Sequence, residues 1–301
     1  MARFRFQFLL TALFSTISIT AAEAQAGRFF LMGDGVLTVN GQKVPFRQGD
    51  GNYDPAGLKA LNQIFKADWA QEEERMDLRF LEAMDYIQDQ LRGRGYNLKS
   101  GYRSPRLNQS LRNKGKLAAQ SSMHMEAAAG DLILLGVNSA DVYEFVKGLD
   151  CCGIGYYHGR HFHFDTGPAR YWDETSSKTE DKTPQENEKI ILQPEFDRYR
   201  SGETMRMKFM RATNYPFGAD AMVEVLKADD SKVAGHTSLT ATGKECLIVQ
   251  DRHQGRTLSA KLPELKPGSY VLRIHFCNRY DYAKMPESIL TRPFEIAKDL
   301  R

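Results

Sequence analysis

The chain has 301 residues, of which 42% are hydrophobic and 26% are charged. This composition is typical of a soluble globular protein, and it excludes an intrinsically disordered chain, a collagen-like repeat and a protein with several membrane spans. The 41 basic and 38 acidic residues leave a formal net charge of +3, which is too small to indicate nucleic acid as a partner. At roughly 150 residues per domain the length predicts two domains, and four cysteines are too few for a disulfide scaffold.

Residues 1–26 have the pattern of a secretory signal peptide. Two arginines precede an apolar run over residues 8–14, and small residues follow it. The run is shorter than the roughly 20 residues that a membrane-spanning helix needs, and an Ala-x-Ala end is typical of a cleavage site. Cleavage after Ala24 or after Ala26 fits equally well. We therefore expect an exported chain, periplasmic or secreted in a bacterium, with no stable membrane span after cleavage.

The first half of the mature chain mixes helical and extended patterns. Apolar side chains at helical spacing predict helices over residues 58–65, 78–91 and 142–149. Short apolar or alternating runs predict strands over residues 96–100, 131–135 and 161–165. Because strand and helix do not alternate regularly, we expect an α+β domain over residues 27–172.

The second half has a different organisation. Residues 173–188 are polar and lack periodicity, which predicts a linker. Beyond it, apolar and polar side chains alternate over residues 205–209 and 270–276, and further short runs are separated by turns. Several short strands of this kind predict an all-β sandwich, immunoglobulin-like, over residues 189–301. Its role is not indicated by the sequence.

The four cysteines fall into two pairs with different expectations. Cys151 and Cys152 are adjacent, and we expect buried structural cysteines there, because no separate histidine and asparagine indicate a cysteine protease. Cys246 and Cys277 lie on candidate strands of the second half. An exported chain could join them in a disulfide, and the sequence leaves this open.

Two histidines and an aspartate alternate near residue 163. Side chains two residues apart in a strand point to the same face, so His161, His163 and Asp165 share one face. A His-x-His strand is by itself a weak signal of metal binding, because exposed histidine pairs are common.

A second fragment carries His124 and Asp131. Asp131 opens a buried strand, where a carboxylate is unfavourable unless another group compensates it. Zinc would compensate it, because catalytic zinc takes three histidine or carboxylate ligands and leaves a fourth position for water. The alternative is that Asp131 caps a helix or pairs with a nearby cation.

A third fragment, residues 100–108, places Arg103 in a Gly-Tyr-Arg-Ser-Pro turn after a strand. A guanidinium held rigidly at the end of a sheet can pair with a carboxylate or stabilise a developing oxyanion. Taken alone, this fragment indicates only a turn.

In this order the three fragments resemble the zinc peptidases that cut bacterial cell-wall peptides. The family pattern runs S-G-Y-R-S-P-x-x-N, then S-x-H-x-x-G-x-A-x-D, then G-x-G-Y-Y and H-x-D-T-G, and this chain follows it at residues 100–108, 122–131 and 153–167. These are the D-Ala-D-Ala peptidases and L,D-endopeptidases, including murein endopeptidases, which share a fold with lysostaphin-type enzymes and the hedgehog signalling domain. The resemblance covers about residues 30–172 and says nothing about the second domain.

The resemblance implies a zinc site with His124, Asp131 and His163 as ligands. It also implies that Arg103 orients the substrate or stabilises its oxyanion, in a metal-assisted hydrolysis. One residue departs from the pattern, since Ala127 stands where the family has glycine. If this position needs a positive φ, alanine costs about 1 kcal/mol there.

The resemblance assigns further residues to substrate binding and proton transfer. Ser104 and Asn108, in the same turn as Arg103, are expected to bind substrate. His161 stands where some relatives keep a histidine beside the metal-bound water. His161 or, failing that, Asp165 would carry the proton to the leaving amine.

We therefore expect an exported zinc metallopeptidase that hydrolyses peptide crosslinks of peptidoglycan, a murein endopeptidase. One alternative is a non-catalytic cell-wall-binding protein with a structural zinc. Another is a D-Ala carboxypeptidase, which would share the same site. The sequence does not distinguish which bond is cleaved, because fold-level resemblance does not fix it.

Overall fold

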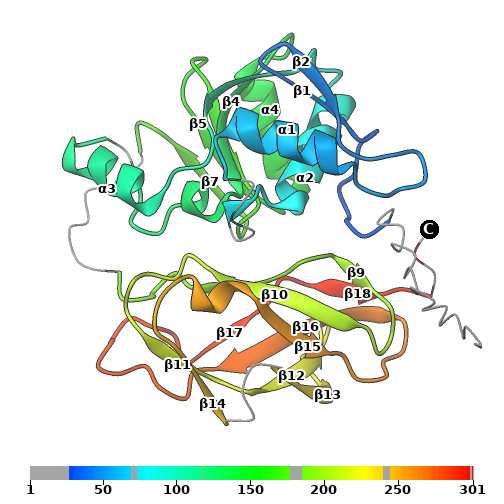
Figure 1. Ribbon diagram of the computed structural model, residues 1–301, viewed down its shortest axis with the longest axis vertical. Coiled ribbons are helices and arrows are strands. Elements are labelled where there is room, and N and C mark those ends of the chain that lie inside the picture. Colours follow the sequence, from blue (N-terminus) through cyan, green and yellow to red (C-terminus); the bar gives the residue numbers. More distant parts are fainter. Residues whose placement is uncertain are drawn as a thin grey trace, which may run out of the picture.

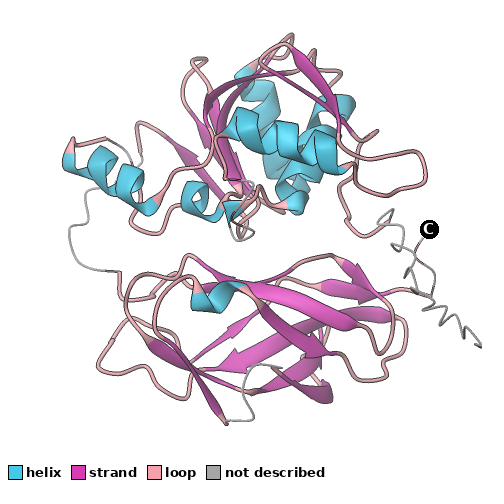
Figure 2. Cartoon of the chain, in the orientation of Figure 1, coloured by secondary structure: helices cyan, strands magenta, loops and turns pink. Residues whose placement is uncertain are grey.

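The computed structural model describes residues 27–68, 71, 74–116, 118–176, 185–239, 245–298 and 300. Helices and a sheet occupy the first half of the chain, and strands dominate the second half, which lies against the first (Figures 1 and 2). The predicted signal peptide, residues 1–26, lies outside the described residues. Within the described ranges, no helix combines the length and apolarity needed to cross a membrane.

The first half is built on one seven-stranded sheet with the order β2-β1-β3-β4-β6-β5-β7. Its strands are β1 (Val36–Val39), β2 (Gln42–Pro45), β3 (Tyr96–Ser100), β4 (Ala129–Leu134), β5 (Gly153–Tyr156), β6 (Phe162–Asp165) and β7 (Arg170–Asp173). The pairs β1–β3 and β5–β7 are parallel and the others are antiparallel. With the helices below, this confirms the predicted α+β character of the first half.

Helices pack against this sheet, and polar caps mark where three of them begin. They are α1 (Pro55–Phe65), α2 (Leu78–Gln90), α3 (Pro105–Asn113), α4 (Ser139–Leu149) and the short 3-10 turn η2 (Met123–Glu126). Side chains of Asp54, Ser104 and Asn138 accept hydrogen bonds from the first backbone N–H groups of α1, α3 and α4. The three predicted helices are confirmed, and α3, which was not predicted from the sequence, begins where the predicted turn at residues 101–105 ends.

The register of the central strands sets up the site. In β4, Asp131 lies opposite Ser100 of β3 on one side and opposite His163 of β6 on the other. Residues that face one another across antiparallel strands have close side chains. The pairing therefore brings a carboxylate and an imidazole together in the middle of the sheet.

The second half consists of strands and one short 3-10 turn over the residues that the structure describes. The elements are β8 (Ile191–Pro194), β9 (Arg198–Tyr199), β10 (Thr204–Met210), β11 (Phe217–Asp220), β12 (Met222–Lys227), β13 (Val233–Ser238), β14 (Cys246–Val249), η3 (Gln254–Arg256), β15 (Leu258–Lys261), β16 (Gly268–His275), β17 (Ser288–Leu290) and β18 (Phe294–Ile296). They form sheets of order β15-β10-β8, β11-β14 and β13-β12-β16-β18-β9.

The alternation predicted in the second half is seen in its strands. Met205, Met207 and Phe209 of β10 are buried, and so are Leu272 and Ile274 of β16. All five belong to one hydrophobic core, which strands of different sheets share. Burial of apolar side chains from both sheets is what holds them together.

The predicted linker over residues 173–188 is partly wrong at both ends. Asp173 is the last residue of β7, and Gln185 and Asn187 are buried. Asn187 accepts from the backbone and hydroxyl of Thr213, and the Ser121 hydroxyl lies 2.8 Å from the Gln185 amide oxygen. These polar side chains are buried because each finds a hydrogen-bond partner. Residues 177–184 lie outside the described residues.

Both cysteine pairs form disulfides. Cys246 of β14 is bonded to Cys277 beyond β16, with Cα atoms 6.0 Å apart. Cys151 and Cys152 are bonded to one another in the turn before β5. Cys152 is buried as expected, whereas Cys151 is only partly buried.

Candidate active site

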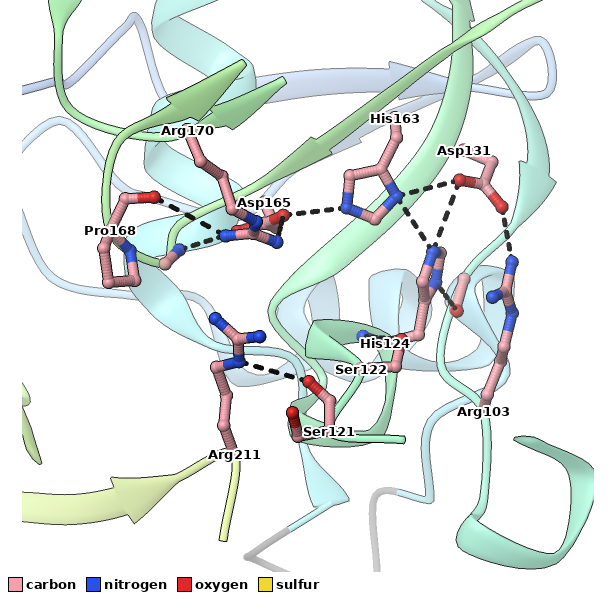
Figure 3. Close-up of polar contacts among 12 residues, drawn as sticks. Arg103, Ser121, Ser122, His124, Asp131, His163, Asp165, Pro168, Arg170 and Arg211 are labelled. Atoms are coloured by element: carbon pink, nitrogen blue, oxygen red, sulfur yellow. Dashed lines mark hydrogen bonds and ion pairs between the residues drawn. The ribbon is translucent and has the colours of Figure 1, made fainter. Parts of the chain in front are cut away.

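Three side chains from η2, β4 and β6 converge on one point (Figure 3). His163 Nδ1 lies 3.0 Å from Asp131 Oδ1, and His124 Nε2 lies 3.3 Å from the same oxygen. The two imidazole nitrogens are 3.2 Å apart. The structure thus brings together the three residues predicted as metal ligands, from positions up to 39 residues apart in the chain.

Two backbone contacts hold the imidazole of His124. Its Nδ1 lies 2.7 Å from the carbonyl oxygen of Gly101, and the backbone N–H of Arg103 donates to the carbonyl of His124. A neutral ring that donates from Nδ1 presents the lone pair of Nε2 to the other two side chains. Burial lowers the pKa of His124, although Asp131 opposes this shift. The lowered pKa and the contact with Gly101 therefore both favour a neutral imidazole whose Nε2 carries the lone pair.

The imidazole of His163 is fixed from the other side by Asp165. The two side chains share one face of β6, as predicted, and His163 Nε2 lies 2.8 Å from Asp165 Oδ2. The Asp165 carboxylate also accepts from both Nη atoms of Arg170 and from the backbone N–H of Gly167. Burial alone would raise the pKa of Asp165, but Arg170 and His163 lower it below its ordinary value.

These contacts correct the role predicted for Asp165. The carboxylate is 0% exposed and three groups already donate to it, so it is not placed to carry a proton to a substrate. An ionised carboxylate bonded to Nε2 instead holds the ring in the tautomer whose Nδ1 carries the lone pair. Asp165 therefore acts as an orienting group for His163.

The chemistry of the three converging atoms fits a metal ion. Burial would lower the pKa of His163, but its contacts with Asp131 and Asp165 raise it above its ordinary value when no metal is bound. When both imidazoles are neutral and donate outward, to Gly101 and to Asp165, lone pairs of two nitrogens and one oxygen face the same space. Burial would raise the pKa of Asp131, but the neighbouring histidines lower it well below its ordinary value, which leaves an ionised ligand. A tetrahedral ion with bonds of about 2.0–2.1 Å separates its ligand atoms by roughly 3.3–3.4 Å. The observed separations of 3.0–3.3 Å are close to that spacing.

Arg103 lies beside the same carboxylate. Its Nη2 donates to Asp131 Oδ2 at 2.5 Å, and its Nε donates to the Ser100 hydroxyl at 2.9 Å. The two oxygens of Asp131 are therefore divided, with Oδ1 facing the histidines and Oδ2 facing the guanidinium. In the described part of the chain, the Nη1 atom of Arg103 has no hydrogen-bond partner.

Aromatic rings line the side of the site next to His163. The His161 ring stacks on Tyr157 with centroids 4.4 Å apart, and the Trp172 ring lies 5.1 Å from that of His163. Burial lowers the pKa of His161, whereas Asp131 opposes this shift electrostatically. The lowered pKa favours a neutral His161 imidazole, which interacts electrostatically with Asp131 and His163.

Two other residues that were predicted to bind substrate have structural contacts. The Ser104 hydroxyl accepts from the backbone of Leu107 as the cap of α3. Asn108 is buried and its amide donates to the carbonyl of Ala119 at 2.9 Å. Their predicted contacts with substrate stay predictions.

The glycines of the Gly-Ile-Gly-Tyr-Tyr motif leave room for the groups behind His163. A Cβ at Gly153 would lie 2.5 Å from the Asp165 carboxylate, and a Cβ at Gly155 would lie 2.4 Å from the Trp172 ring. Neither Arg170 nor Trp172 was singled out from the sequence. The two glycines were the available signal, because a strand glycine often marks a close approach by another group.

A second group of side chains could also hold a metal ion. Asp34, Asp85 and Asp89 bring carboxylate oxygens within 4.8 Å of one another beside β1. Burial, together with Asp89 and Asp34, raises the pKa of Asp85 to about 7, although the Gly35 N–H opposes this. With no histidine among its members, this group differs in chemistry from the three-residue site.

Comparisons with known proteins agree with the geometry of this half. A family model described as "Peptidoglycan L,D-endopeptidase MepK" matches residues 35–172. The protein of that name from Escherichia coli (strain K12) is 31% identical over 144 residues, which cover 46% of this chain and 79% of the relative. Its counterpart from Shigella flexneri gives the same values.

Among solved structures, CopC from Methylosinus trichosporium OB3b covers 35% of this chain and 88% of its own, with 13% identity. Its TM-score of 0.20 carries no argument. The family match, in contrast, includes η2, β4 and β6, which supply the three converging side chains. On this similarity, the chain belongs to the family of the peptidoglycan L,D-endopeptidase MepK.

Proposed function

We propose that this chain is a metallopeptidase that hydrolyses peptide crosslinks of peptidoglycan, with a zinc ion held by His124, Asp131 and His163. The observation that carries the proposal is the convergence of two histidine lone pairs and a carboxylate oxygen in a buried site. Two nitrogens and one oxygen are donors that zinc prefers, and three protein ligands are typical of a catalytic rather than a structural zinc. The activity of the related MepK proteins supports the choice of substrate.

When bound, zinc would lower the pKa of a water molecule and polarise the scissile carbonyl. The residues of the chain would then have distinct tasks. Asp165 holds the tautomer of His163, and Gly101 holds that of His124. Arg103 fixes Asp131 through Oδ2, and its remaining N–H donors would bind a substrate carboxylate or the carbonyl oxygen as charge develops.

We assign proton transfer to His161. Burial lowers its pKa, so that the imidazole is neutral at pH 7 and can accept a proton. Its stacking on Tyr157 restricts the ring next to the ligands. Positioning of a base in this way is what makes proton transfer to a leaving amine efficient.

We also propose a domain organisation and a location. Residues 27–172 would form the peptidase domain, and residues 189–301 an immunoglobulin-like β-sandwich domain. Phe29, at the start of the first range, packs in the hydrophobic core of the second half. A signal peptide over residues 1–26 would direct the chain to the periplasm or the outside of the cell, where peptidoglycan is accessible. The two disulfides are consistent with an oxidising compartment.

The test is incubation of the purified mature chain with isolated sacculi, with and without zinc, followed by identification of the products. After the glycan strands are digested with a muramidase, an endopeptidase is seen as a loss of crosslinked muropeptide dimers and a gain of monomers, and only when zinc was present. A carboxypeptidase would release free D-alanine instead. A wall-binding protein would bind the sacculi and release nothing, and that result would overturn the proposal.

A further inference from the structure

The turn that carries His124 is held by charged residues of the second half of the chain. Glu126, two residues after His124, is 3% exposed. Its Oε1 accepts from Arg252 at 3.1 Å, and its Oε2 accepts from Arg256 at 2.5 Å. The two arginines come from the segment between β14 and β15 and are themselves 6% and 9% exposed. We call these three residues the arginine clamp.

The two arginines of the clamp bind the backbone of the turn as well as the carboxylate of Glu126. Nη2 atoms of Arg252 and Arg256 donate to the carbonyl of Met125 at 2.9 and 3.0 Å. Met125 is the residue that follows His124 directly. Two successive residues after the histidine are thus fixed by contacts to positions more than 120 residues away in the chain.

A further residue of the second half holds the other side of the turn. Arg211, just after β10, donates from its backbone N–H to Glu126. Its Nε donates to the carbonyl of Ser121 (Figure 3). Ser121 lies directly before Ser122, whose hydroxyl begins η2 by accepting from His124. Contacts from the second half therefore bracket the histidine on both sides.

The turn needs such support because its own backbone is unfavourable. Ala127 closes η2 with φ of 53°, a left-handed conformation in which side chains with a Cβ are disfavoured. A single 3-10 turn also has few hydrogen bonds of its own. External contacts are therefore expected to decide where the His124 imidazole lies relative to the other two ligands.

We propose that the second half of the chain is a positioning element of the metal site, acting through Glu126, Arg252 and Arg256 on the turn that carries His124. The proposal rests on the proposed three-ligand metal site and assigns a role to the part of the chain that the family match does not cover. Glu126 and the two arginines are positioning residues, since they contact the ligand turn and not the ligand atoms.

A buried ion pair elsewhere in the same interface provides a control. Arg79 of α2 pairs with Asp197, which lies between β8 and β9, and both side chains are 5% exposed. The hydrogen bonds and ion pairs of these two side chains, in the described part of the chain, go to residues outside η2. Changing Asp197 therefore disturbs the packing of the two halves without changing the contacts of the His124 turn.

The test compares full-length variants Glu126→Gln, Arg252→Ala, Arg252→Lys and Asp197→Asn. Zinc dissociation constants are measured by competition with a chelator, and the visible spectrum of the Co²⁺-substituted protein reports the ligand geometry. Losing a group that orients a ligand typically weakens metal binding about 10- to 100-fold. We expect losses of this size in Glu126→Gln and Arg252→Ala, with a changed Co²⁺ spectrum. Arg252→Lys should recover part of the affinity, because it keeps the charge but not the two-pronged geometry.

The melting temperature of each metal-free variant separates positioning from general stabilisation. Asp197→Asn should melt earlier than wild type but bind zinc within about threefold of it. If Glu126→Gln and Arg252→Ala also melt earlier and bind zinc within threefold, the contacts only hold the halves together and the proposal is wrong. Should one of the two fail to fold, the other together with Arg252→Lys gives the same comparison.

The same measurements distinguish this proposal from the proposed function. A wild-type protein that binds one zinc and does not cleave sacculi contradicts the proposed function alone, and the affinities still test the clamp. A folded wild-type protein that binds no zinc contradicts both.

Discussion

Replacing Asp165 by asparagine changes how His163 faces the metal site. The carboxylate now accepts from Nε2 at 2.8 Å, which leaves Nδ1 as the lone-pair atom next to Asp131. The amide of asparagine can turn its NH₂ group toward the ring and donate to Nε2. The ring proton then moves to Nδ1, where it takes the place of the lone pair that would bind the proposed zinc ion.

The expected size of the effect follows from these contacts. Loss of a carboxylate that orients a histidine ligand typically weakens metal binding about 10- to 100-fold, which corresponds to about 1.4–2.7 kcal/mol. Stability should fall as well, because Arg170 loses an ionised partner. Since the Arg170 side chain is 33% exposed, water replaces part of that contact, and the loss should stay below the roughly 3–5 kcal/mol of a fully buried pair.

The assay measures the zinc dissociation constant and, separately, the rate of crosslink hydrolysis at saturating zinc. Asp173→Asn is the matched control, because Asp173 pairs with His158 on the protein surface. We expect the control to match wild type in both measurements. Zinc affinity within about threefold of wild type in Asp165→Asn would refute the orienting role. A lower rate with unchanged affinity would instead favour proton transfer by Asp165.

Three further predictions concern other parts of the first half. Arg103→Ala should lower kcat for crosslinked muropeptides by about 10²–10³-fold at saturating zinc. Arg103→Lys should recover little of this rate, because lysine lacks the planar guanidinium. A rate for Arg103→Ala within threefold of wild type would show that the guanidinium is not used. In the folded protein the pKa of Asp85 is raised to about 7. Its protonation therefore stabilises the fold fully below about pH 4, and this stabilisation is lost as pH rises through 7. The free energy of unfolding should fall by at most about 4 kcal/mol over that range. Denaturant unfolding at pH 5 and pH 8 should show this loss in wild type and a smaller one in Asp85→Asn, and equal losses would contradict it. Gly155→Ala should weaken zinc binding and lower the melting temperature, because its Cβ would displace Trp172 from beside His163; unchanged values in both measurements would show that the strand accommodates the methyl group.

Most helices and strands of the first half could be predicted, because the spacing of apolar residues within each segment indicates its secondary structure. The alternation around His163 placed His163 and Asp165 on one face of a strand, and the structure joins them by a hydrogen bond. The role of Asp165 could not be predicted in the same way. It depends on Arg170, which is close in sequence but lies on β7, two strands from β6 in the sheet order.

Contacts between the two halves of the chain could not be predicted from local sequence patterns. Glu126 was part of a recognised motif, but its partners Arg252 and Arg256 are 126 and 130 residues further along the chain. Nothing in the spacing of either segment indicates that the two meet. The buried Asn187 was likewise predicted to be a linker residue, because a polar side chain signals exposure unless its hydrogen-bond partners are known.

The sequence predicted a cost for Ala127 only if this position needs a positive φ, and it could not predict whether it does. Alanine at position 127 departs from the family pattern, and the structure gives it φ of 53°, as a glycine would adopt there. The conformational cost of alanine can be predicted from the sequence, but the contacts that hold the turn in this conformation cannot. The arginine clamp supplies such contacts.

The central claim is that His124, Asp131 and His163 hold one zinc ion that the hydrolysis requires. Its most direct test is elemental analysis of the purified mature chain, combined with hydrolysis of crosslinked muropeptides as zinc is removed and restored. We expect about one equivalent of zinc per chain, activity that follows zinc occupancy, and loss of both in a folded His163→Ala variant. A folded, zinc-free protein with full activity would contradict the account.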